Sequence, residues 1–192
     1  ILEAFIKAGP WKSAEKAKIG LLELSQKMLK DLVSWPTARR MWQARVVRFA
    51  DWFTEGEILR QAELLSSHTE VWGRATVTDT NFTLVGKADR VDVLHDGTAR
   101  IYDYKTGPLP SNAQQFHFDK QLLLEAEILQ QGGFDGLNVL RVAEATYIGV
   151  GNELKLAKAP LGEDEVWVKF SELIKSYQNP NQGYTARRAM LM

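Results

Sequence analysis

Two aspartates and a lysine lie in a short segment whose other residues favour β-strands. Two apolar-rich runs flank Asp96 and Gly97, a pair that is typical of a hairpin turn. Asp89 lies in the first run, and Asp103 and Lys105 lie at the end of the second. Because side chains alternate along a strand, Asp103 and Lys105 are expected on the same face of the sheet.

The length of the hairpin loop decides whether the two aspartates meet. A two-residue loop would leave Asp89 and Asp103 on opposite faces of the sheet. A three-residue loop, with Gly97 in the left-handed conformation, pairs Leu94 with Thr98 and places Asp89 directly opposite Asp103. We favour this second register.

An acid pair of this kind indicates a metal site. Facing carboxylates repel, and burial increases the cost unless a proton or a cation lies between them. Mg²⁺ is bound by oxygen ligands and typically takes one or two protein carboxylates. Two acids, a metal ion and a lysine form a site that can cleave phosphodiester bonds. The alternative is a surface ladder of Asp, Lys and Arg ion pairs, which periodicity alone does not exclude.

Three sequence elements carry a resemblance to a known family. Residues 86–92 read G-K-A-D-R-V-D, residues 103–107 read D-Y-K-T-G, and Gln121 is followed by Leu122 at the start of a predicted helix. In order and spacing these elements resemble the RecB-like branch of the PD-(D/E)XK nuclease superfamily. Within that branch, residues 70–133 look most like the nuclease domain of an AddB-type subunit of the AddAB helicase–nuclease, in which Glu125 is a variant of the α-proteobacterial group.

The resemblance implies a fold and a set of site residues. The fold is α/β, a restriction-endonuclease-like core with a central mixed β-sheet flanked by helices on both sides. Asp89, Asp103 and the backbone carbonyl of Tyr104 would bind Mg²⁺, for which Mn²⁺ can substitute. Lys105 would position the attacking water and neutralise charge on the phosphate. Gln121 would orient Lys105 or the DNA backbone.

Two further ligands are suggested more weakly by the family pattern. Glu70 matches a position where relatives often carry an acid before the first strand, although a surface glutamate is the alternative. Residues 2–5 read L-E-A-F, similar to the end of a family motif whose metal-binding histidine would fall just before Ile1. We therefore expect the metal site to be completed from outside this chain.

The implied function is that of a metal-dependent DNA exonuclease domain in double-strand break repair by homologous recombination. Its partners would be DNA and an AddA-type helicase–nuclease subunit. Two alternatives remain: a stand-alone RecB-like or Cas4-like exonuclease, and a non-catalytic nuclease-like domain that guides DNA or serves as a scaffold. The presence of Asp89, Asp103 and Lys105 favours an active domain.

Composition limits these possibilities. The 192 residues suit a single domain, 1–192, which we expect to be a fragment of a larger subunit. The absence of cysteine excludes an iron–sulfur cluster within this chain, although many relatives hold one. The 24 basic residues equal the 24 acidic ones, which favours a module whose DNA is delivered by a larger machine. With no signal peptide or membrane-length apolar run, we expect a cytoplasmic protein with no membrane partner.

The remaining elements follow from capping and periodicity. Ser13 should cap a helix over residues 14–32, with Ile19, Leu22, Leu29 and Leu32 on its buried face. A second helix should start near Pro36; its four arginines (39, 40, 45 and 48) would either touch phosphates or form a solvated face paired with acids. Strands are predicted over 70–77, 84–94, 98–104 and 138–150, helices over 118–131 and 163–177, a loop over 108–112 beside the metal, and an extended tail over 183–188.

Overall fold

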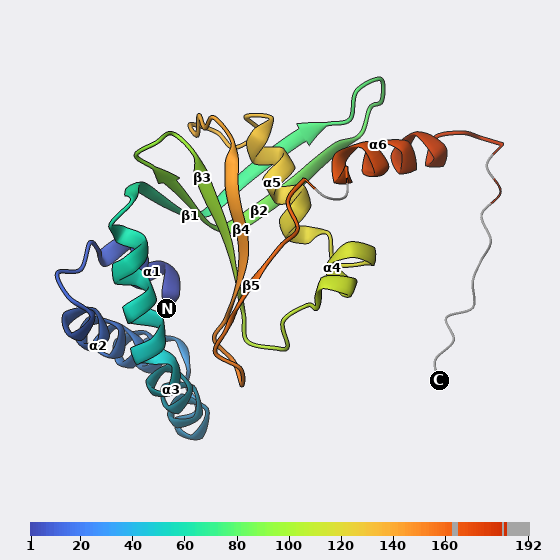
Figure 1. The fold of residues 1–192 in the computed structure, drawn as a ribbon. Coiled ribbons are helices and arrows are strands. Elements are labelled where there is room, and N and C mark those ends of the chain that lie inside the picture. Colours follow the sequence, from blue (N-terminus) through green and yellow to red (C-terminus); the bar gives the residue numbers. More distant parts are fainter. Residues whose placement is uncertain (163–164, 182, 184–192) are drawn as a thin grey trace.

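The computed structural model describes residues 1–162, 165–181 and 183. Its elements follow the chain in the order α1 (Leu2–Ala8), α2 (Ala14–Leu32), α3 (Pro36–Gln61), β1 (Leu64–Thr76), β2 (Thr83–Leu94), β3 (Ala99–Lys105), α4 (Asn112–His117), α5 (Gln121–Gln130), β4 (Val142–Gly149), β5 (Leu156–Lys158) and α6 (Val166–Tyr177). The strands form one mixed sheet in the order β1-β2-β3-β4-β5, in which β3 and β4 are parallel and the other neighbours antiparallel (Figure 1).

Helices cover both faces of this sheet. On one face, α1, α2 and α3 pack around Phe5, Phe53 and Ile148; on the other, α5 packs around Leu122 and Tyr147 (Figure 1). These five side chains are all fully buried, so each face has its own core. The predicted α/β fold, a mixed sheet with helices on both sides, is confirmed. No helix in the described part of the chain has the length and apolar character needed to cross a membrane.

The hairpin of β2 and β3 has the predicted register. Val91 pairs with Ile101, and the Leu94 N–H donates to the Thr98 carbonyl at 2.8 Å. Gly97 has a φ of 79°, in the left-handed region that glycine adopts without steric cost. The three-residue loop is therefore correct, and the two-residue alternative is wrong.

Helix α2 begins and ends at the predicted residues, but only part of its predicted buried face is buried. Ser13 caps it by accepting the Lys16 N–H at 3.3 Å. Of the four residues expected in the core, Leu29 is buried and Leu22 is half-buried, as predicted, whereas Ile19 and Leu32 are 50% and 74% exposed. Its buried residues are spaced four apart, as in helix packing along i±4 ridges. They are Ala17, Leu21, Ser25 and Leu29. Two members of this row are small, so close helix approach rather than side-chain hydrophobicity selects the face.

The segment between β3 and β4 also differs from the prediction. The loop expected over residues 108–112 leads into the short helix α4, which starts with a capping box between Ser111 and Gln114. Phe118 ends α4 instead of starting the next helix, so α5 begins at Gln121. This arrangement brings the first turn of α5 beside the end of β3, where the candidate site lies.

Several outer boundaries differ from the prediction as well. β1 begins at Leu64 rather than at residue 70, because its first residues pair with the end of β2. The strand expected over 138–150 is reduced to β4, and the short edge strand β5 was not predicted. The predicted last helix is α6, from Val166; its expected first residue, 163, and the tail over 184–188 lie outside the described residues.

Candidate active site

Asp89 lies where the ladder between β2 and β3 ends. The last ladder pair is Arg90 with Tyr102, one pair before the two aspartates. At the next position, the Tyr104 N–H donates to Asp89 Oδ2 at 2.9 Å instead of to a backbone carbonyl of β2. Among the described residues, the other Asp89 oxygen accepts no hydrogen bond. The side chain is thus fixed beside β3 with one oxygen free to bind a cation.

Asp103 is the buried acid of the pair, with only 4% of its surface exposed. Its Oδ1 accepts a hydrogen bond from Gln121 Nε2 at 3.0 Å, and its Oδ2 lies 2.9 Å from Lys105 Nζ. The lysine contact is an ion pair without hydrogen-bond geometry, so Oδ2 keeps its capacity to accept a bond. Burial raises the pKa of Asp103, Lys105 opposes this shift, and the nearby Asp89 charge adds to it.

Gln121 connects the acids to the lysine. Its Nε2 donates to Asp103 Oδ1 at 3.0 Å and to Glu125 Oε1 at 3.2 Å, while its Oε1 accepts from Lys105 Nζ at 3.2 Å. The amide orientation is fixed by chemistry, because only the NH₂ group can donate to the two carboxylates and only the carbonyl can accept from the ammonium. The structure therefore brings together Asp103, Lys105 and Gln121, as the sequence predicts; their roles in catalysis stay predictions.

Glu125 is a site residue whose position the sequence reasoning did not anticipate. Its carboxylate is 5% exposed, and Oε2 is buried without a hydrogen-bond partner among the described residues. Burial raises the pKa of Glu125 to about 7, and the charges of Asp103 and Asp89 add to the shift. The available signal was its spacing: a residue four places after Gln121 lies on the same face of a helix.

We expect Glu125 to make the metal-free protein less stable as the pH rises. Since its folded pKa is about 7 and its ordinary value is 4.5, the folded state keeps a proton that the unfolded state releases between these values. Stability should fall through this window and level off above it. Glu125→Gln removes this loss and should be more stable than the wild type by up to about 3 kcal/mol at pH 8, with little difference near pH 4.5.

Urea denaturation in EDTA at several pH values from 4.5 to 8 measures this difference. Glu55→Gln, at an exposed position of α3, is the matched control and should not change the pH profile. A gap between wild type and Glu125→Gln that stays constant from pH 5 to pH 8 would show that Glu125 is not a buried acid of this kind.

The other predicted ligands have mixed outcomes. Glu70 forms an ion pair with Lys87 rather than a contact with Asp103, and it raises the pKa of that lysine. Its backbone has a φ of 57°, an unusual value for a glutamate within a strand. The Tyr104 N–H holds Asp89, as described above, whereas metal binding by the Tyr104 carbonyl stays a prediction.

The donor set at the acid pair fits a hard divalent cation in part. Within the described residues, no group of three or more His, Cys, Asp or Glu side chains is placed to hold a metal ion. Two carboxylates with free acceptor capacity, one on Asp89 and one on Asp103, are nevertheless enough for Mg²⁺, which usually keeps several waters. The remaining coordination positions would be filled by water or by groups outside this chain.

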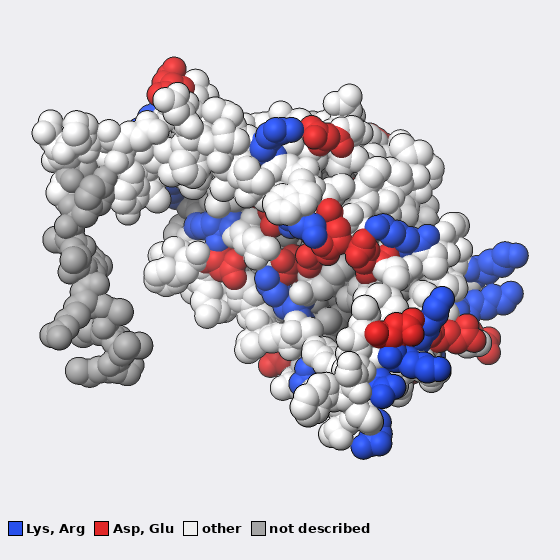
Figure 2. Space-filling model, turned by 180° about the vertical axis from the view of Figure 1, so that it is seen from behind, with Lys and Arg blue, Asp and Glu red and all other residues white. Residues whose placement is uncertain are grey.

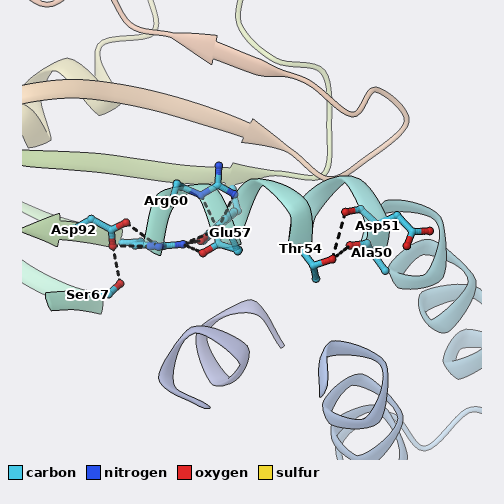
Figure 3. Close-up of polar contacts among 9 residues, drawn as sticks. Ala50, Asp51, Thr54, Glu57, Arg60, Ser67 and Asp92 are labelled. Carbon is cyan, nitrogen blue, oxygen red and sulfur yellow. Dashed lines mark hydrogen bonds and ion pairs between the residues drawn. The ribbon is translucent and has the colours of Figure 1, made fainter. Parts of the chain in front are cut away.

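The other charged residues of residues 86–92 face away from this site. Arg90 is 1% exposed and donates to both oxygens of Asp92 at 2.7 Å and to both oxygens of Glu57 at 2.8 Å. Arg60 also binds Glu57, at 2.7 Å, and the Ser67 hydroxyl donates to Asp92 at 2.6 Å (Figure 3). Two arginines thus balance two acids in a buried network that joins α3 to β2.

The arginines of α3 outside this network have no acidic partners among the described residues. Within the part of the chain that the structure describes, none of the four at positions 39, 40, 45 and 48 forms an ion pair with a carboxylate. Arg45 lies over the Trp42 ring at 4.8 Å, and Arg48 donates to the Gly151 carbonyl. Figure 2 shows Lys and Arg side chains interspersed with Asp and Glu at the lower right, the side of α2 and α3. The described residues show no pairing of these arginines with acids, and both alternatives, contact with phosphates and a solvated face, stay predictions.

Comparisons with known proteins place this chain in a family. A family model of the PD-(D/E)XK nuclease superfamily matches residues 1–189. An uncharacterised protein of Rickettsia typhi is 25% identical over 138 residues, which cover 69% of this chain and 16% of that protein. One of Rickettsia conorii is 22% identical over 176 residues, which cover 84% of this chain and 21% of that protein. The crystal structure of SSO0001 is similar with a TM-score of 0.41 at 12% identity, over 85% of this chain and 87% of that one.

This chain spans about a fifth of the length of the curated relatives it matches. The family match, in contrast, extends over nearly all of the chain. The chain therefore belongs to the PD-(D/E)XK nuclease superfamily.

Proposed function

We propose that this chain is the nuclease domain of an AddB-type subunit and hydrolyses DNA phosphodiester bonds with a bound Mg²⁺ during double-strand break repair. The observation that carries the proposal is the contact set at the end of β3: Lys105 lies 2.9 Å from the buried Asp103, and Gln121 bridges the two. A surface ion-pair ladder would not bury the acid or bind it with an amide from another element.

Each side chain has a chemical task in this proposal. When bound at Asp89 and Asp103, Mg²⁺ would lower the pKa of a water molecule and polarise the phosphate. Lys105 would place its ammonium beside the scissile phosphate and stabilise the charge that develops there. Gln121 would hold that ammonium through its carbonyl, so that Lys105 is positioned before the substrate arrives.

Other observations support DNA as the substrate and an AddA-type subunit as the partner. Four arginines of α3 have no acidic partner among the described residues and offer donors for phosphate oxygens. Phosphate contacts carry no base information and suit a nuclease without sequence specificity. The relatives are several times longer than the matched segment, which suits a nuclease domain within a large subunit. The order of the three sequence elements and Glu125 favour the AddB type.

Metal binding is the first test of the proposal. An ion that binds the folded protein alone stabilises it, by about 1.4 kcal/mol at ten times its Kd. For a chain of this size, Mn²⁺ at that concentration should raise the Tm by about 3–6 °C. Asp103→Asn should abolish this shift and should also abolish Mg²⁺-dependent digestion of linear DNA.

The matched control is Asp135→Asn, since Asp135 is an aspartate whose side chain is 89% exposed. This variant should retain the full Mn²⁺ shift and the full digestion rate. If millimolar Mn²⁺ does not change the Tm of the wild type, or if Asp103→Asn digests DNA at the wild-type rate, then the acid pair is not a catalytic metal site.

A further inference from the structure

The side-chain amide of Gln121 uses both of its hydrogens. One acceptor is Asp103 Oδ1 on β3, at 3.0 Å, and the other is Glu125 Oε1, at 3.2 Å, one turn further along α5. The amide oxygen in turn accepts from Lys105 Nζ at 3.2 Å. If the amide were turned over, its oxygen would face two carboxyl groups and its NH₂ group would face an ammonium, which cannot accept a hydrogen bond. The acceptors of the amide nitrogen therefore decide whether Gln121 can hold Lys105.

Glu125 is a rigid acceptor for this amide. Its side chain is 5% exposed. The aliphatic part of the side chain lies against β2, because a Cβ atom added at Gly86 would be 3.4 Å from Glu125 Cγ. Buried neighbours on α5 fix the helix in the core, and these are Leu122, Ala126 and Leu129. Packing thus places Glu125 Oε1 beside the Gln121 amide before any substrate binds.

Asp103, the other acceptor, has a second task in the proposed function. Its Oδ2 lies 2.9 Å from Lys105 Nζ, and the same carboxylate would bind the metal ion. A bound cation would draw charge away from the carboxylate and weaken its hydrogen bond with Gln121, since ionised acceptors make the stronger bonds. Glu125 is not a ligand in that proposal, so its Oε1 would still accept from Gln121. Glu125 is therefore the acceptor that can hold the amide during the reaction.

We propose, resting on the function proposed above, that Glu125 is a positioning residue for the cleavage step. Its carboxyl oxygen holds the Gln121 amide so that the amide oxygen faces Lys105, which keeps the ammonium beside the scissile phosphate. This task requires an acceptor rather than a charge, because an amide can donate to a neutral or an ionised carboxyl group alike. An apolar residue could fill the same space at a lower cost of burial, but it could not hold the amide.

Single-turnover digestion of a labelled oligonucleotide at saturating Mg²⁺ tests this with two variants. Glu125→Met keeps the length of the side chain and removes the acceptor. It should slow cleavage about 10-fold, less than the loss of Lys105 itself, because the ammonium is still present but is less well placed. Glu125→Gln keeps an acceptor oxygen without the charge and should recover most of the rate. The Kd for the oligonucleotide in EDTA should be the same in both variants as in the wild type.

Two measurements distinguish positioning from a merely structural role. At pH 8, Glu125→Met should be at least as stable to urea as the wild type, because it removes a buried carboxyl group whose Oε2 has no hydrogen-bond partner among the described residues. Slower cleavage in a protein of undiminished stability cannot come from partial unfolding. In crystal structures with Mn²⁺ bound, the contact between Gln121 Oε1 and Lys105 Nζ should persist in Glu125→Gln and be lost in Glu125→Met.

Glu127→Met is the matched control, because Glu127 is a half-buried acid of the same helix, two residues further on and on its opposite side. It should cleave at the wild-type rate. A double-mutant cycle then tests the route through the amide. In a Gln121→Met background, Glu125→Met should have little further effect, since both changes remove the same contact to Lys105.

The outcomes separate this inference from the proposed function. If the wild type digests DNA and Glu125→Met does so at the same rate, or if Glu125→Gln is as slow as Glu125→Met, the inference is overturned and the proposed function stands. Losses that add in the double-mutant cycle also overturn it. If Glu125→Met abolishes the Mn²⁺-induced rise in Tm, Glu125 acts on the metal rather than on Gln121, which overturns it as well. A wild type that digests no DNA overturns both.

Discussion

Replacing Lys105 by alanine is expected to slow Mg²⁺-dependent DNA cleavage by a factor of about 10²–10³, the usual cost of removing one preorganised donor from a transition state. The ammonium is held in place before substrate binds: Lys105 Nζ lies 2.9 Å from Asp103 Oδ2 and 3.2 Å from Gln121 Oε1, and the side chain is 30% exposed. Single-turnover digestion of a labelled oligonucleotide gives the rate of the chemical step.

The same variant should bind metal at least as tightly as the wild type. Lys105 neutralises Asp103 in the metal-free protein and therefore competes with any cation for Oδ2. Removing it leaves the carboxylate free, so the Mn²⁺-induced rise in Tm should be preserved or larger. Loss of cleavage together with intact metal binding distinguishes Lys105 from Asp103, whose replacement should abolish both.

Two controls keep this result specific. Lys158→Ala removes a lysine that is 69% exposed and paired with Glu144 on the neighbouring strand, and it should cleave at the wild-type rate. Lys105→Arg keeps the charge but replaces a compact ammonium with a planar fork, so it should recover only part of the activity. Cleavage by Lys105→Ala within about threefold of the wild-type rate would mean that another group carries the charge assigned to this residue.

The hairpin was predictable because its information is local. Asp96 and Gly97 select the loop, the loop sets the register, and the register determines which side chains share a face. A few neighbouring residues are therefore enough to predict that Asp89 and Asp103 lie on one side of the sheet. The Ser13 cap and the start of α2 were predictable for the same reason.

Features that depend on distant contacts were not predictable in this way. Ile19 and Leu32 are apolar and at helical spacing, yet α2 presents them to solvent because its packed row contains small residues. Glu125 gave only a spacing signal; its burial depends on how α5 lies across the sheet. The exposure of Phe118 depends on where α4 ends, and α4 itself starts at a capping box in a segment that was predicted to be a loop.

Residues 86–92 illustrate the difference between the two kinds of information. The sequence shows Asp89, Arg90 and Asp92 close together, as if all three served one site. Alternation along β2 sends Asp89 to the side of Asp103, and Arg90 and Asp92 to the side of α3. Asp89 lies in the candidate active site, while Arg90 and Asp92 form a buried network with Glu57. The structural role of Arg90 and Asp92 could not be predicted from the sequence, because it depends on where α3 places Glu57.

Replacing Arg90 by methionine is expected to destabilise the protein by about 3–5 kcal/mol, because removing one partner of a buried ion pair leaves an uncompensated charge. Asp92 would keep only the Ser67 hydroxyl, at 2.6 Å, and Glu57 would keep only Arg60. Methionine has a similar length and no charge, so the loss would come from the charge network rather than from a cavity. Urea denaturation at pH 7 measures the change in the free energy of unfolding.

Arg74→Met is the matched control, since Arg74 pairs with Asp135 at 3.6 Å and both side chains are largely exposed; such pairs contribute about 0–1 kcal/mol. Adding Asp92→Asn to Arg90→Met should recover part of the loss, because an amide costs less to bury than a carboxylate. If Arg90→Met costs no more than Arg74→Met, the network does not hold α3 on β2. If it costs several kcal/mol while the Mn²⁺-induced rise in Tm persists, then the two faces of β2 carry separate tasks, because the acid pair would still form in a weakened fold.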